Sequence, residues 1–242
     1  MTNKTSDHYL EELVRGASLA FANAEDLYRE GIALFACKAL SRALFLHQIS
    51  LEECGKVEML GWWATGHLMG FSIDLRKIKL RLASHKAKNF ANAYMLPVSN
   101  AEHKARAELD WRASAAAFRE QQAAFHQQSN TLKNASLYVD FVNDKFLAPG
   151  ERITEDMIHE IANRNHTFIE LMRPKVQMLT LWVQEADATR EILKYFRKRM
   201  EELKEKYPDE PQKAFDIILE EMMAQAMKVE HKAMPPEDNT QQ

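Results

Sequence analysis

Residues 40–60 read LSRALFLHQISLEECGKVEML and carry the strongest structural signal of this 242-residue chain. Apolar residues recur here at helical spacing and cover much of the circumference, which predicts a helix from about Ala33 to Met59 that is buried on several sides. A helix of this kind is typical of the centre of a bundle. It nevertheless carries Glu52, Glu53 and Lys56, and charged side chains on a largely buried helix must have partners.

The rest of the composition extends this helical signal. Glycine and proline are scarce, at seven residues each, and 46% of the chain is hydrophobic, which is enough to bury a full core. Long stretches consist of residues that lose little rotamer freedom in a helix. We therefore predict an all-α fold. The 32 basic and 35 acidic side chains give a net charge of −3, so any nucleic-acid binding must come from a local patch.

A change in composition near Glu185 predicts the domain organisation. We expect a helical domain over residues 1–184, an appended C-terminal helical hairpin over 185–234 with a narrow apolar stripe, and a disordered tail over 235–242. The run Leu137–Val142 is rich in β-branched and aromatic residues and predicts at most a small β-hairpin. Thr154 is a predicted helix N-cap.

The sequence also suggests a compartment. The N-terminal segment is polar, and the most apolar stretch, Leu60–Ile73, is too short to span a bilayer. The two cysteines, Cys37 and Cys54, lie in apolar helical segments without a C-x-x-C spacing, so we expect buried thiols. Together these features predict a cytoplasmic protein with no membrane association.

A strongly basic segment follows, predicted as one helix from about Ile73 to just before Pro97. Lys77, Arg81, His85 and Lys88 recur at positions i, i+4, i+8 and i+11 and would share one face, with Lys86 close by. Such a stripe suits a phosphate backbone. The alternative is a solvated face whose charges pair with the acidic C-terminal hairpin.

His85 adds a group that can transfer protons to this stripe. An imidazole accepts and donates protons near neutral pH, while neighbouring cations stabilise a developing phosphorane. RNA cleavage needs little more, because the ribose 2′-hydroxyl supplies the nucleophile. On the preceding helix either Glu52 or Glu53 could pair with Lys56, and a buried pair could orient His85 or Lys88. Otherwise the pair is an ordinary surface interaction worth a few tenths of a kcal/mol.

These landmarks resemble one known family. The segments Asn23–Leu27, Ala39–Lys56, His85–Lys88, Leu137–Asp140 with Lys133, and Pro149–Asp156 occur in the order typical of the AbiV family of abortive infection proteins. The resemblance implies a HEPN-like helical domain, many of which are dimeric, metal-independent endoribonucleases active in defence against phage. It also implies a toxin that damages RNA or blocks translation when a phage-encoded activator appears.

The resemblance also implies site residues. The family's acidic signature falls on Glu52, Glu53, Gly55 and Lys56, its histidine-lysine signature on His85, Lys86 and Lys88, and its Tyr-Val-Asp signature on residues 138–140. We expect catalysis by His85, Lys88, Glu53 and Lys56, and RNA binding by Lys77, Arg81, Lys86 and Tyr138. The general HEPN pattern, an arginine followed four to six residues later by histidine, offers Arg42 and His47 as an alternative catalytic pair.

Other chemistry has less support in the sequence. Asp156-x-x-His159 is the nearest approach to a di-iron motif and has no second copy, so we expect no metal and no cofactor. The favoured hypothesis is a homodimeric toxin that cleaves RNA. The alternative is a non-enzymatic helical module that binds a phage or host protein, with Tyr138 and the hairpin as contact surfaces.

Overall fold

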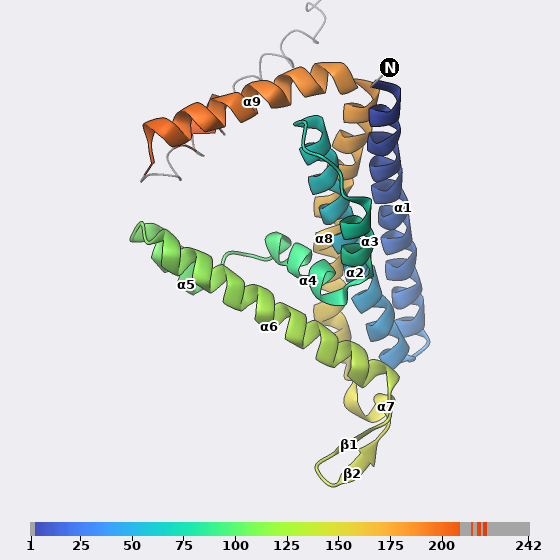
Figure 1. Ribbon diagram of the computed structural model, residues 1–242. Coiled ribbons are helices and arrows are strands. Elements are labelled where there is room, and N and C mark those ends of the chain that lie inside the picture. The colour runs from blue at the N-terminus through green and yellow to red at the C-terminus, as the bar shows by residue number, and fades with distance from the viewer. Residues whose placement is uncertain (1–2, 209–213, 215–216, 219, 222–242) are drawn as a thin grey trace, which may run out of the picture. The chain divides into compact units, whose positions relative to one another are not determined.

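The computed structural model describes residues 3–208, 214, 217–218 and 220–221. Most of them are helical, which confirms the all-α prediction. The elements are α1 (Asn3–Ala36), α2 (Leu40–Leu68), α3 (Leu75–Ala83), α4 (His85–Asn92), η1 (Ala93–Met95), α5 (Asn100–Ala107), α6 (Trp111–Leu137), β1 (Asp140–Val142), β2 (Lys145–Leu147), α7 (Pro149–Arg152), α8 (Glu155–Gln184) and α9 (Ala186–Lys206) (Figure 1).

The chain divides into two compact units. One comprises Met1–His67 and Phe71–Glu185, and the other comprises Leu68–Gly70 and Ala186–Gln242. In the second unit Phe196 and Leu203 of α9 form a small apolar core with Ala214 and Ile218. The predicted tail 235–242 and much of the hairpin's second limb lie outside the described residues.

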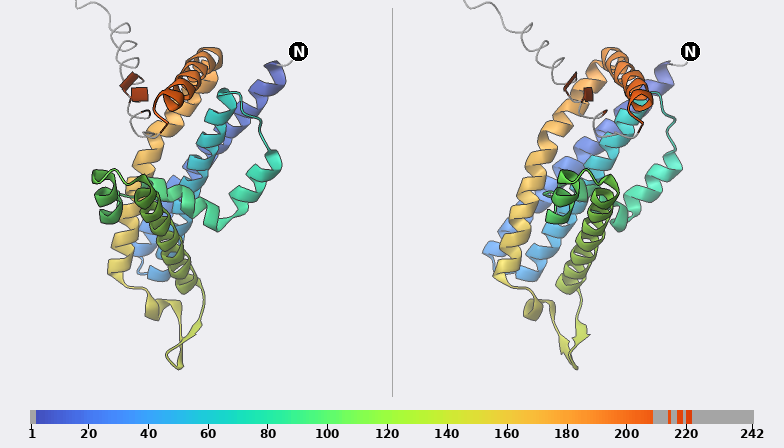
Figure 2. Two further views of the ribbon diagram at one scale, coloured as in Figure 1. Left: turned by 60° about the vertical axis from the view of Figure 1, so that its left-hand side comes forward. Right: turned by 90° about the vertical axis from the view of Figure 1, so that its left-hand side faces the viewer.

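Three long helices frame the first unit. α1 packs along α8, and α2 runs beside both (Figures 1 and 2). Leu44, Leu51 and Val57 of α2 are fully buried. The helix is therefore central, as its apolar circumference predicts.

Polar side chains of α2 are tied to the helices around it. Ser50 Oγ donates to Ala24 O of α1 at 2.6 Å, and Asn165 Nδ2 of α8 lies 3.2 Å from Nδ1 of the buried His47. Glu58 accepts from Lys175 of α8 at 2.5 Å. Buried polar groups require such partners, and these contacts fix the register of α2 against α1 and α8.

Gly31 does not end the first helix, although its position suggests a C-terminal cap. α1 continues through it to Ala36. A Cβ at Gly31 would lie only 2.9 Å from the ring of His47. The glycine therefore serves close packing of α1 on α2.

The basic segment is not one helix, so the helical spacing that placed Lys77, Arg81, His85 and Lys88 on one face does not extend across it. Ser84 has extended backbone (φ −83°, ψ 114°) and separates α3 from α4. Its N–H donates to Arg81 O and its hydroxyl accepts from Ala87 N, so one residue closes the first helix and caps the second. The direction in which a side chain of α4 points therefore does not follow from the helical spacing of α3.

The small hairpin and the helix after it agree with the sequence. β1 and β2 pair antiparallel, with Phe141 opposite Phe146, and the turn residues Asn143 and Asp144 have φ of 51° and 61°. Two consecutive left-handed residues are typical of a type I′ turn. Thr154 caps α8 by accepting from Met157 N, as predicted.

Candidate functional site

The carboxylate of Glu52 is the centre of a charged cluster made by three helices. Glu52 is 2% exposed. Its Oε1 accepts from Lys133 Nζ of α6 at 2.7 Å. Its Oε2 lies 2.7 Å from Lys88 Nζ and 2.6 Å from His85 Nδ1, both on α4. We call Glu52, His85, Lys88 and Lys133 the Glu52 cluster.

A glycine allows α4 to reach this carboxylate. A Cβ at Gly55 would lie 2.5 Å from Lys88 O and 3.0 Å from Asn92 Oδ1, distances that a side chain cannot occupy. Asn92 Nδ2 also donates to Leu51 O at 2.7 Å, which fixes the two backbones in contact. The glycine of the Glu-Glu-x-Gly-Lys motif is therefore the physical condition for the approach of α4 to α2.

The electrostatics of the Glu52 cluster leave positive charge in excess. Burial raises the pKa of Glu52, but hydrogen bonds from Lys133, Lys88 and His85 outweigh burial and lower that pKa below its ordinary value. The ionised carboxylate is shared by two ammonium groups whose side chains are only 8% and 10% exposed. One negative and two positive charges leave a net charge of +1 in a nearly dry setting, and such charge favours a nearby anion.

His85 forms the solvent-facing edge of the Glu52 cluster. Its side chain is 56% exposed while Nδ1 contacts the buried carboxylate. A carboxylate can only accept, so Nδ1 carries the hydrogen, and in the neutral ring Nε2 holds the lone pair. His85 thus presents a base whose orientation is set by Glu52.

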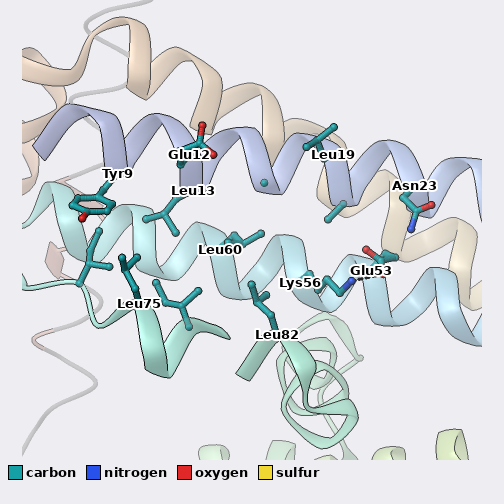
Figure 3. Close-up of a pocket in the computed structure, with 14 residues that line it drawn as sticks. Tyr9, Glu12, Leu13, Leu19, Asn23, Glu53, Lys56, Leu60, Leu75 and Leu82 are labelled. Atoms are coloured by element: carbon teal, nitrogen blue, oxygen red, sulfur yellow. Dashed lines mark hydrogen bonds and ion pairs between the residues drawn. The ribbon is translucent and has the colours of Figure 1, made fainter. Parts of the chain in front are cut away.

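The predicted pair of Glu53 and Lys56 forms but does not face His85. Lys56 Nζ donates to Glu53 Oε1 at 2.6 Å. Both residues line a groove of about 450 Å³ between α1, α2 and α3, together with apolar side chains such as Leu13 and Leu60 (Figure 3). Consecutive residues of a helix point about 100° apart, so Glu52 faces α4 and α6 while Glu53 faces the groove. The acid that pairs with Lys56 is thus Glu53, whereas the acid that contacts His85 is Glu52.

Arg42 and His47 differ in their exposure to solvent. Arg42 is exposed, whereas His47 is fully buried and packs edge-on against Tyr28 at a ring separation of 5.4 Å. Burial lowers the pKa of His47 to about 4. A ring in this state is a neutral core histidine at pH 7, which disfavours the alternative catalytic pair.

The buried histidine should make stability depend on pH. The unfolded chain binds a proton at His47 near pH 6.5 and the folded chain only near pH 4, so the free energy of unfolding should fall as the pH drops through this window, by at most about 3 kcal/mol. Urea unfolding at pH 7, 5.5 and 4.5 measures the loss, and His47→Gln should flatten the slope. An equal slope in both proteins would contradict a buried neutral ring.

The remaining predicted RNA-binding residues are all solvent-exposed. Lys77 and Arg81 lie on α3, Lys86 lies on α4 with Nζ 5.2 Å from the centre of the Phe90 ring, and Tyr138 caps the C-terminus of α6. Lys86 and Tyr138 are close in sequence to members of the Glu52 cluster, whereas Lys77 and Arg81 precede the break at Ser84. Cys37 is exposed, contrary to prediction, and Cys54 is buried.

Two residues of the site had no role assigned from the sequence. Lys133 holds the second oxygen of Glu52, and His126 of α6 lies near the cluster through Asn89, whose Nδ2 is 3.2 Å from His126 Nδ1. The spacing of seven between His126 and Lys133 places them on one helix face, which is a signal that the sequence does contain.

Neither a metal site nor a membrane span is visible in the described part of the chain. Its residues bring no three His, Cys, Asp or Glu side chains together in an arrangement that could hold a metal ion. Within the same residues, every helix falls short of the length and apolar character that crossing a bilayer requires.

Comparison with known proteins gives a family. The profile of the HEPN family described as AbiV matches residues 12–170, which include the whole Glu52 cluster. The uncharacterized protein y4gJ of Sinorhizobium fredii is 41% identical over 107 residues, covering 44% of this chain and 56% of that protein. The chain thus matches little more than half the length of this relative. No solved structure matches. Because the family profile covers most of the chain, the protein belongs to the AbiV family of HEPN-type abortive infection proteins.

Proposed function

We propose that this protein is a metal-independent endoribonuclease that acts as a toxin in abortive infection, with the Glu52 cluster as its active centre. The observation that carries the proposal is the buried excess of positive charge beside a solvent-exposed, carboxylate-oriented imidazole. A phosphodiester matches both features, because its anionic oxygens need cations and its cleavage needs a base. Family membership supports the same class of function.

The proposed reaction uses the ribose 2′-hydroxyl as nucleophile. His85 Nε2 takes the hydroxyl proton while O2′ forms a bond to phosphorus. The bond from phosphorus to O5′ breaks, and O5′ takes a proton from water, while the imidazolium of His85 gives its proton to the hydroxide that remains. The products are a 2′,3′-cyclic phosphate, a free 5′-hydroxyl and a neutral His85. Glu52 stabilises the imidazolium that forms, and Lys88 and Lys133 place positive charge next to the phosphate. Glu53 and Lys56 border the groove and have no role in this step.

The test is RNA cleavage by the purified protein and its variants. His85→Ala should lower the rate by about 100-fold or more without unfolding the chain, because the ring is largely exposed. Arg42→Ala should cleave at the wild-type rate, since Arg42 does not contact the cluster. Product ends identified as cyclic phosphates support the mechanism. If Arg42→Ala removes cleavage and His85→Ala does not, the assignment of the site is wrong.

Exposed cations around the cluster should affect substrate binding more than the chemical step. Lys86→Ala should raise KM several-fold with little change in kcat, because it removes a phosphate contact that is the same before and during reaction. The KM increase should shrink as salt rises, since counterions then compete for the phosphates. Equal effects on kcat and KM at all salt concentrations would exclude a simple binding role.

A non-enzymatic interaction module is the second candidate. It is favoured by exposed apolar side chains of the β-hairpin formed by β1 and β2. Phe141 and Phe146 are 57% and 75% exposed there, beside the exposed Tyr138 and Val139. Intact RNA in every cleavage assay, together with binding of a phage or host protein that Phe146→Ser removes, would support this candidate. We also propose that the chain forms a homodimer and that a phage-encoded protein activates it. Sedimentation of the purified chain tests for the homodimer.

A further inference from the structure

His126 lies on the side of α6 that faces α4. It precedes Lys133 by seven residues, so the two share one helix face, and Lys133 reaches Glu52 at 2.7 Å. On α4, His85 and Asn89 are four residues apart and also share a face. Asn89 is 1% exposed and holds His126 through the 3.2 Å contact between Nδ2 and Nδ1. The two histidines are thus presented by facing sides of neighbouring helices, each held by a buried partner.

The buried partners give the two rings opposite polarity. The amide nitrogen of Asn89 donates to Nδ1 of His126, so in the neutral ring the hydrogen is on Nε2. Nδ1 of His85 instead donates to Glu52, which leaves the lone pair on Nε2. His85 therefore offers an acceptor at its outer nitrogen, and His126 offers a donor.

The surroundings keep His126 in this donor form. Burial is the largest cause that lowers its pKa, and Lys86 of α4 and Lys133 of its own helix lower it further. Glu52 of α2 opposes them, and His85 of α4 adds a smaller lowering. The ring is therefore neutral at pH 7, and its Nε2–H is a fixed dipole. Such donors stabilise charge that develops on an oxygen without any reorganisation during reaction.

We propose that the Nε2–H of His126 donates a hydrogen bond to a non-bridging oxygen of the phosphate group that His85 acts on, with Asn89 as the residue that positions this donor. This inference rests on the proposed ribonuclease function and adds a phosphate-binding group supplied by α6. The excess positive charge of the Glu52 cluster holds the anion, and His126 determines where its oxygens lie.

Cleavage by three variants tests the donor. His126→Ala should lower kcat by about 100-fold, the usual effect of removing one oxyanion donor. His126→Gln carries an N–H near the position of Nε2 and should retain cleavage within about tenfold of the wild type, because the donor is kept. His103→Ala, at an exposed histidine of α5, is the matched control and should match the wild type. Equal loss in the alanine and glutamine variants would overturn the donor role.

Asn89→Asp supplies a readout that mere misfolding does not give. The new carboxylate accepts from Nδ1–H and raises the pKa of His126. The charged ring still donates from Nε2, so cleavage persists below the raised pKa wherever His85 is still a neutral base. Above the raised pKa, Nε2 loses its hydrogen and the cleavage rate should fall. Asn89→Ala should show no such additional fall in rate with rising pH. A pH profile of Asn89→Asp that parallels the wild type would overturn the positioning role of Asn89.

A binding experiment separates this inference from the proposed catalysis. A 2′-O-methyl oligonucleotide cannot react but keeps the phosphates, and ¹⁵N-labelled histidine reports on each ring in the full chain. Addition of the oligonucleotide should shift the Nε2 resonance of His126, and inorganic phosphate should shift it less. A shift in a protein that leaves RNA intact would sink the ribonuclease proposal alone. No shift at His126 would sink this inference, whether or not RNA is cut.

Discussion

Glu52→Gln is expected to lower the free energy of unfolding by about 3–5 kcal/mol, the range seen when one partner of a buried ion pair is removed. Two ammonium groups would then remain buried without a counterion, and the hydrogen bond that orients His85 would weaken. We therefore expect RNA cleavage to fall together with stability. Urea unfolding at pH 7 gives the first quantity, and initial cleavage rates at a temperature where the variant is folded give the second.

Two further variants isolate the charge effect. Glu53→Gln changes the neighbouring acid, whose lysine partner is 29% exposed, and should cost about 1 kcal/mol or less. Combining Glu52→Gln with Lys133→Met removes one of the unpaired cations and should recover part of the loss, because the two changes act on one interaction. If Glu52→Gln and Glu53→Gln were equally stable, the charged cluster would not be a structural element.

The free energy of unfolding at acid pH should also depend on the carboxylate of Glu52. The pKa of Glu52 is lowered in the folded state, so its contribution is complete above the unfolded value of 4.5 and is lost as the pH falls through the folded pKa. The His47 effect lies at higher pH, between about 6.5 and 4. Glu52→Gln should therefore weaken the pH dependence below 4.5 and keep the slope above it.

Gly55→Ala is expected to have the second largest effect. The added methyl group would lie 2.5 Å from Lys88 O, so α4 must move away from α2. Such overpacking costs about 1–3 kcal/mol. A displacement of about 1 Å at a catalytic base lowers rates by about 100-fold, so cleavage should fall more than stability suggests. Unfolding and cleavage assays on one preparation measure both.

Gly16→Ala is the matched control for Gly55→Ala. Gly16 is also inside a long helix, but a Cβ there meets Leu60 Cδ1 at 3.5 Å, an ordinary contact. The change should leave cleavage unaltered and stabilise the helix by up to about 1 kcal/mol. A loss of cleavage in both variants would point to helix rigidity rather than to the contact between α2 and α4.

Local signals accounted for much of the fold. The apolar circumference around Leu44 and Leu51 predicted a central helix, and the hydroxyl of Thr154 predicted a helix start, because both depend on neighbours in sequence. The helix break at Ser84 was missed although a serine N-cap is a local signal. In that segment the regular spacing of cations from Lys77 to His85 gave the more conspicuous pattern.

The different partners of Glu52 and Glu53 could not be predicted from local sequence. Both acids can reach Lys56 by helical spacing, and only the positions of α4 and α6 distinguish them. Glu52 meets partners 33, 36 and 81 residues away in sequence. No periodicity within α2 encodes contacts of that range, so the sequence identified the motif but not which of its two acids meets α4 and α6.

The amino-acid sequence by itself determined that the chain is helical, that α2 is buried, and that His85 lies in a basic segment, since each follows from residue type and spacing. Only the tertiary structure decided that Lys88 and Lys133 share the carboxylate of Glu52, that His47 is a neutral core residue and that His126 lies near the Glu52 cluster. The reason is that charge and protonation depend on which helices meet, and that is set by close packing at positions such as Gly55 and Gly31.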